Sequence, residues 1–154
     1  MNGWKKVERS GEMDFRLMLK SRRLAGMFAD VWQSLTVEDR NQISNRLTVV
    51  SDHSVLRYIL TGGDEIVNGA AVPIHSGGCF VFLNALELRK EPDEFVRYVI
   101  AHELAHAYHN HTGRFELDRK TKEAQADRRA KLWGFPAPKL TIKTGVKFPA
   151  GGMA

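Results

Sequence analysis

The sequence predicts an α+β fold in which N-terminal helices precede about three strands and two further helices. Apolar residues recur at near-helical spacing across residues 11–34 and 36–50, with charged residues between them. Such spacing is typical of helices that pack one face on a core. Residues 55–83 are instead rich in β-forming residues and contain glycine turns, which indicates strands. Helical patterns return after Pro92, which places the strand region between two helical regions.

Three segments of the middle region are the predicted strands, namely residues 55–60, 67–74 and 79–83. Gly62-Gly63-Asp64 and Gly77-Gly78 lie between them, and glycine clusters of this kind mark turns. The third segment, from Cys79 to Leu83, is an unbroken apolar run. It therefore suits a strand that is buried or that faces a substrate.

Two helices follow the strands. Asp93 is a suitable N-cap for a helix over residues 94–109. A second helix is expected over 120–133, because Gly134 is a good residue just past a helix end and the prolines that follow prevent continuation. We therefore predict a single domain over residues 1–135 and a basic tail containing proline and glycine over 136–154.

The composition is that of an ordinary globular protein, with 43% hydrophobic and 27% charged residues in 154 residues. The first twenty residues hold no long apolar run, and Cys79 is the only cysteine. These features favour a cytoplasmic protein with no membrane partner and no disulfide framework.

The net charge of +5 is concentrated near the C-terminus, since residues 119–147 contain nine Lys or Arg against two acids. This segment is a candidate contact for nucleic acid, although such runs are more often solvated helix faces.

The most informative motif is His102-Glu103-Leu104-Ala105-His106, inside the helix predicted over 94–109. Residues four apart lie on one face of a helix, so both imidazoles can bind one zinc ion. Glu103 lies about 100° around the helix from His102. A carboxylate at that place can act as general base on a zinc-activated water. An amphipathic helix with two unrelated histidines is the simpler alternative.

A catalytic zinc site usually has three protein ligands, so two histidines leave it one ligand short. Glu123 on the next predicted helix is the candidate third ligand, seventeen positions after His106. Asp127 lies on the same helix face and can accept the free ring N–H of a zinc-binding histidine. The alternatives are surface ion pairs of Glu123 with Lys120 and of Asp127 with Lys131.

The pattern His-Glu-x-x-His followed by Glu123-x-x-Ala126-Asp127 resembles that of gluzincin peptidases. The surrounding sequence, over about residues 79–135, is similar to ImmA/IrrE-like proteins and to the catalytic core of HtpX-type peptidases. The resemblance implies a compact zincin-like domain and a zinc-dependent metallopeptidase that acts on protein or peptide substrates. It implies zinc ligation by His102, His106 and Glu123, with Glu103 as general base. It also implies that residues 79–83 form the edge strand on which a substrate peptide lies.

Three residues near the motif are candidates for accessory roles. His109 can contact the substrate or serve as another ligand, but a histidine at this place more often caps the helix end, where the dipole favours a positive charge. Tyr108 and His111 are candidates for stabilising an oxyanion. A different class of function also fits the sequence: a zincin-like regulatory or interaction module that binds a protein or DNA through the basic C-terminal region.

Overall fold

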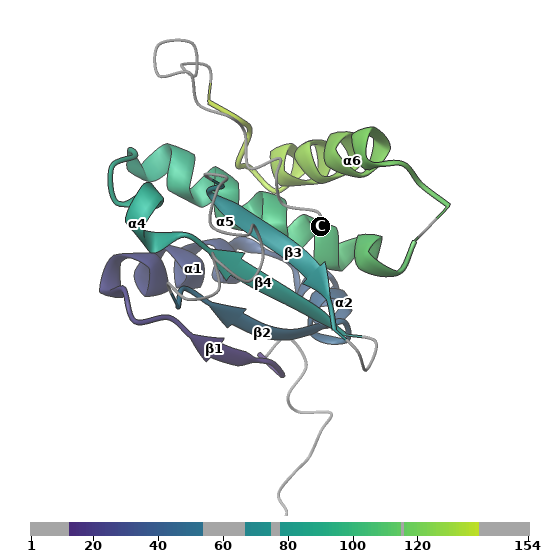
Figure 1. The fold of residues 1–154 in the computed structure, drawn as a ribbon, viewed down its shortest axis with the longest axis horizontal. Coiled ribbons are helices and arrows are strands. Elements are labelled where there is room, and N and C mark those ends of the chain that lie inside the picture. Colours follow the sequence, from purple (N-terminus) through teal and green to yellow (C-terminus); the bar gives the residue numbers. More distant parts are fainter. Residues whose placement is uncertain (1–12, 54–66, 75–77, 115, 139–154) are drawn as a thin grey trace, which may run out of the picture.

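The computed structural model of the chain describes residues 13–53, 67–74, 78–114 and 116–138 (Figure 1). Its elements in chain order are β1 (Arg16–Met18), α1 (Arg22–Ser34), α2 (Val37–Ser44), β2 (Leu47–Ser51), β3 (Gly69–Pro73), β4 (Cys79–Leu83), α4 (Ala85–Leu88), α5 (Asp93–Tyr108), the 3₁₀ turn η2 (His111–Gly113) and α6 (Arg119–Leu132). Helices are combined with one sheet, which agrees with the predicted α+β class. The strand predicted over 55–60 and most of the predicted tail, residues 139–154, lie outside the described residues.

The described sheet has four strands in the order β1-β2-β4-β3, rather than about three. The β1–β2 and β2–β4 pairs are parallel, and β3 is antiparallel to β4. The expectation that residues 79–83 form the edge strand is therefore wrong, because β4 lies between β2 and β3. An unbroken apolar run is typical of a strand that is covered on both faces. Val81 and Phe82, whose side chains point to opposite faces, are indeed each only 1% exposed. The outer strands among those described are β1 and β3.

The extra strands arise in segments predicted as helix. Residues 11–34 contain β1 before α1, and residues 36–50 contain α2 and then most of β2. Leu17 and Met18 of β1 are exposed, so this short strand carries no alternating pattern that reveals it. Its pairing with Val49–Ser51 depends on contact between segments that are distant in sequence.

Local signals define the ends of the two C-terminal helices. Asp118 caps α6 by accepting a 2.8 Å hydrogen bond from the amide of Thr121. Gly134 follows the helix with a φ of +99°, a conformation that strongly favours glycine. The predicted cap of α5 is displaced by one residue, because Asp93 is the first helical residue and Pro92, which has no capping side chain, is at the N-cap.

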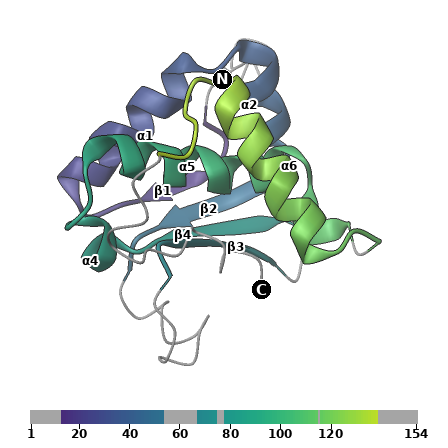
Figure 2. The ribbon, with the colours of Figure 1, turned by 90° about the horizontal axis from the view of Figure 1, so that it is seen from above.

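Helix α5 occupies the centre of the structure. Figure 2 shows α1, α2, α5 and α6 on one side of the sheet, and α5 contacts β3, β4 and each of the other three helices. Every residue of α5 from Tyr98 to Ala107 is consequently buried. Helix α6 lies along α5 through Ala126 and Ala130, which are fully buried and small enough to allow a close approach. None of the helices in the described parts of the chain combines the length and apolar character needed to cross a membrane.

Candidate metal centre

The two histidines of the motif lie side by side in the interior. His102 is 1% exposed and His106 is fully buried, and their Nε2 atoms are 3.2 Å apart. Their spacing of four residues places them one helical turn apart on the same face of α5. This face is directed at α6, which packs against α5.

Glu123 of α6 completes the group. Its Oε1 lies 2.8 Å from Nε2 of His102, and its Oε2 lies 3.3 Å from Nε2 of His106. One ligand atom from each of the three residues can be chosen so that all lie within 4.8 Å of one another. The group predicted from the sequence is therefore assembled in the structure, and it could hold a metal ion.

The protonation of this group in the metal-free protein follows from its contacts. Burial disfavours the charged form of His102, but hydrogen bonds to Asp127 and Glu123 outweigh it and raise its pKa to about 10. Burial also opposes ionisation of Glu123, yet the hydrogen bonds from the two histidines lower its pKa to about 2. Both shifts reflect the close pairing of the His102 ring with the carboxylate of Glu123.

Glu103 is fully buried beside the three ligands. Neither of its carboxylate oxygens has a hydrogen-bond partner among the described residues. Burial is the main cause that raises the pKa of Glu103 to about 8. Buried carboxylate oxygens without partners are costly. A bound cation would offset that cost, so the residues present fit a metal ion.

The outer partners of His102 are Asp127 and Tyr98. Oδ1 of Asp127 accepts hydrogen bonds from Nδ1 of His102, at 2.8 Å, and from the hydroxyl of Tyr98, at 2.7 Å. The Asp127 contact is the one expected from the sequence. Tyr98 was not predicted, although its position four residues before His102 places it on the same helix face and is the signal that could have revealed it.

His111 and Gln125 stand next to His106. Nδ1 of His111 lies 2.9 Å from Nδ1 of His106, and Nε2 of His111 lies 2.7 Å from Oε1 of Gln125. His111 is fully buried. Because both ring nitrogens of His111 are occupied by these contacts, the side chain is not available as the oxyanion donor considered from the sequence. Gln125 was not predicted at all.

His109 and Tyr108 do not join the group. His109 is the C-cap residue of α5, and its ring stacks on that of His111 with centroids 5.0 Å apart. Burial, followed by neighbouring His111 and Arg129, lowers the pKa of His109 to about 4, so the ring is neutral and the expected favourable charge at the helix end is missing. The ring of Tyr108 lies 5.7 Å from that of Trp133 and 4.4 Å from the guanidinium of Arg129.

Cys79, the first residue of β4, is 2% exposed. Burial is the main cause that raises the pKa of its thiol to about 12. The side chain therefore remains a neutral thiol at physiological pH and is a poor candidate for a metal ligand or a nucleophile.

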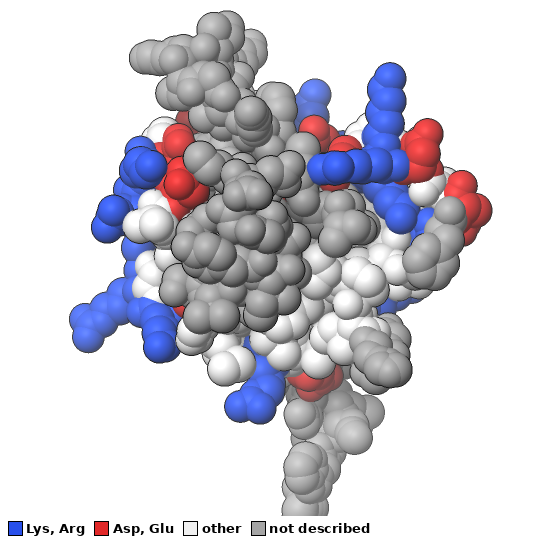
Figure 3. Space-filling view, in the orientation of Figure 1, with Lys and Arg blue, Asp and Glu red and all other residues white. Residues whose placement is uncertain are grey.

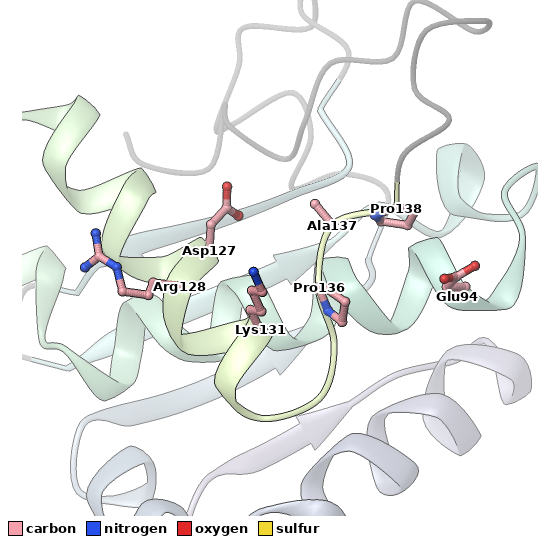
Figure 4. A pocket seen from close by; sticks show the side chains of 7 residues that line it. All are labelled: Glu94, Asp127, Arg128, Lys131, Pro136, Ala137 and Pro138. Carbon is pink, nitrogen blue, oxygen red and sulfur yellow. The ribbon is translucent and has the colours of Figure 1, made fainter.

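A surface pocket of about 710 Å³ borders the candidate metal centre at Asp127. Figure 4 shows it extending from Arg128 and Lys131 on α6, past the segment 136–138, to Glu94 at the start of α5. The three ligand residues and Glu103 are not part of its lining. Of the residues around the candidate metal centre, Asp127 is therefore the one that lines this pocket.

Comparisons with known proteins give no relative for this chain. No family model matches it, and no curated protein or solved structure matches it either. The function is therefore inferred from the residues and contacts of the chain itself.

Proposed function

We propose that this chain is a zinc-dependent metallopeptidase with a zincin-like domain of the gluzincin type. The observation that carries the proposal is the cluster of His102, His106 and Glu123, whose ligand atoms lie within 4.8 Å of one another. Two imidazoles and one carboxylate are a common protein ligand set of catalytic zinc sites, which keep a further position open. A purely structural site has no need of a buried acid such as Glu103 beside the ligands.

The chemistry follows from the residues around the cluster. Bound zinc would supply a Lewis acid that lowers the pKa of water and polarises the substrate carbonyl. Glu103 would take one proton from the attacking water and deliver it to the nitrogen of the cleaved peptide bond, which leaves as an amine. Its fully buried position keeps bulk water away from the carboxylate that carries this proton. Asp127 would hold the ring of His102 in the orientation required of a ligand.

The substrate would lie along β3. This strand is antiparallel to β4 and is an outer strand of the described sheet, and an extended peptide can add to such an edge through main-chain hydrogen bonds. Gly69 at the start of β3 is next to Glu103, because a Cβ atom added there would lie 3.1 Å from both Cγ and Oε2 of that residue. The peptide would therefore pass close to the proposed general base.

Gly69→Ala is expected to reduce kcat about tenfold while leaving the zinc content unchanged. The added methyl group is crowded by Glu103 and by the Phe82 carbonyl oxygen, also 3.1 Å away, so the carboxylate has to shift. Displacements of about 1 Å can be costly in catalysis. Gly26→Ala is the matched control, since nothing lies within 4 Å of a Cβ at that position. Equal kcat values for the two variants, with zinc bound in both, would contradict the proposed closeness of β3 to the reacting groups.

The proposal is tested on the wild-type protein by elemental analysis and a peptide-hydrolysis assay. We expect close to one zinc per chain, and hydrolysis that stops when a chelator removes the metal and returns when zinc is added. Hydrolysis that survives complete removal of the metal would refute the zinc mechanism. Bound zinc without hydrolysis of any peptide or unfolded protein tested would refute the peptidase assignment and leave a metal-binding module.

The alternative of a DNA-binding interaction module has less support. In the view of Figure 3, the Lys and Arg side chains of the described residues around α6 stand among Asp and Glu side chains, so the charges seen there are of both signs. One of the basic residues, Arg129, is also engaged with the ring of Tyr108. DNA binding that weakens with salt and is lost on neutralising Arg128 and Lys131, in a chain without peptidase activity, would favour the alternative.

A further inference from the structure

A chain of three side chains leads outward from the second histidine of the motif. His106 belongs to α5, His111 to the turn η2 and Gln125 to α6, and the successive contacts measure 2.9 and 2.7 Å. The turn back toward His106 passes through Asn110, which has a φ of +57°. Asparagine tolerates this left-handed conformation better than most residues, so the sequence permits the reversal that brings His111 back to the helix.

The direction of the hydrogen bonds is set at both ends of this chain. The side-chain oxygen of Gln125 only accepts, so Nε2 of His111 carries the proton that it donates. At the other end, a metal at Nε2 of His106 leaves the proton of that ring on Nδ1, which then donates to Nδ1 of His111. The two requirements agree, because a neutral His111 that donates from Nε2 accepts at Nδ1.

We propose that His111 and Gln125 are positioning residues that hold His106 in the tautomer and orientation required for metal binding. This inference rests on the metal site of the proposed function and extends it to residues outside the motif. Each histidine ligand would then be oriented by its own pair of hydrogen-bonded residues. His102 is bonded to Asp127, which also bonds Tyr98. His106 is bonded to His111, which also bonds Gln125.

The arrangement also explains a pattern in α6. Glu123, Gln125 and Asp127 alternate with small residues, and all three act on the same site from one helix: as ligand, as support of His106 through His111, and as support of His102. Because His111 is fully buried, Oε1 of Gln125 is the acceptor that satisfies the N–H group at Nε2 of His111. If Gln125 lost its oxygen, Nε2 of His111 would keep a buried proton without this partner, and the opposite tautomer, which cannot accept from His106, would become competitive.

The first test needs no substitution. In the zinc-loaded wild-type protein, ¹⁵N NMR of the imidazole rings should show His111 protonated at Nε2 and unprotonated at Nδ1, with His106 protonated at Nδ1. His111 protonated at Nδ1 would overturn the proposal, because that ring could not accept the proton of His106.

The second test compares the zinc affinity of variants by competition with a chelator. We expect Gln125→Leu to weaken zinc binding by roughly tenfold, the lower end of the usual cost of losing an outer partner of a ligand, because Gln125 acts on His106 through His111. Gln125→Glu, which retains an acceptor, should bind zinc at least as tightly as the wild type. Lys120→Leu is the control, since Lys120 is an exposed residue of the same helix. Wild-type affinity in Gln125→Leu would overturn the proposal.

The outcome for His111 is separable from the outcome for peptide hydrolysis. If the protein binds zinc and cleaves no peptide, the peptidase assignment fails, while the NMR and affinity measurements still decide the role of His111 and Gln125. If hydrolysis depends on zinc but Gln125→Leu binds the metal normally, the peptidase assignment stands and the positioning role is rejected.

Discussion

Replacing Glu103 by glutamine is expected to lower kcat for peptide hydrolysis by roughly 10²- to 10⁴-fold, the range typical of removing a general base. Glutamine has nearly the same size as glutamate but cannot take a proton from water. Glu103 is not one of the three residues whose atoms converge as ligands, so zinc should remain bound. The metal-free variant should be about as stable as the wild type near pH 7, because burial raises the pKa of Glu103 to about 8 and the substitution then replaces one neutral group by another of nearly the same size.

The measurements are kcat, zinc content and the midpoint of thermal unfolding without metal. Glu94→Gln is the matched control, since Glu94 is an exposed acid on the same helix and should keep full activity. Undiminished hydrolysis by Glu103→Gln would remove Glu103 from the mechanism. A loss of zinc together with activity would instead indicate that this carboxylate binds the metal.

Glu123→Ala is expected to weaken zinc binding by more than roughly 100-fold, because the loss of a direct ligand should cost more than the roughly 10- to 100-fold typical of losing an outer partner of a ligand. Alanine leaves only the two histidines, and it also removes the carboxylate whose oxygens lie 2.8 and 3.3 Å from their Nε2 atoms. Peptide hydrolysis should fall with the zinc content and recover only in part at high zinc concentration. Zinc affinity by chelator competition measures the effect.

The control for this substitution is Glu116→Ala. Glu116 precedes α6 and is fully exposed, with its carboxylate paired to Arg114. We expect this variant to bind zinc as the wild type does. Equal zinc affinity in Glu123→Ala and Glu116→Ala would show that the third ligand has been assigned wrongly. His111 would be a poor candidate for the third ligand in place of Glu123, because both of its ring nitrogens already contact other side chains.

The part of the site predicted from the sequence depends on local geometry. The positions of His102 and His106 relative to each other follow from the 3.6-residue period of a helix. The end of α6 before Gly134 follows from a capping preference that involves only neighbouring residues. Glu123 could be named as well, because it is an acid at a suitable place on the helix that comes next.

The sheet was predicted less well because strand pairing depends on residues that are far apart in sequence. β1 is three exposed residues long, and its strand conformation depends on hydrogen bonding to β2. The apolar run of β4 indicates burial but does not indicate which strands lie beside it. The edge next to the proposed active site accordingly belongs to β3 and not to β4.

By itself, the sequence determined the α+β class, the helix that carries the two histidines and the set of residues that could hold a metal ion. Only the tertiary structure decided the strand order and the roles of Tyr98, His111 and Gln125 around the ligands. The physical reason is that helix periodicity and capping act within a few residues. The hydrogen bonds that orient His102 and His106, in contrast, come from α6 and η2 and depend on how these elements pack against α5.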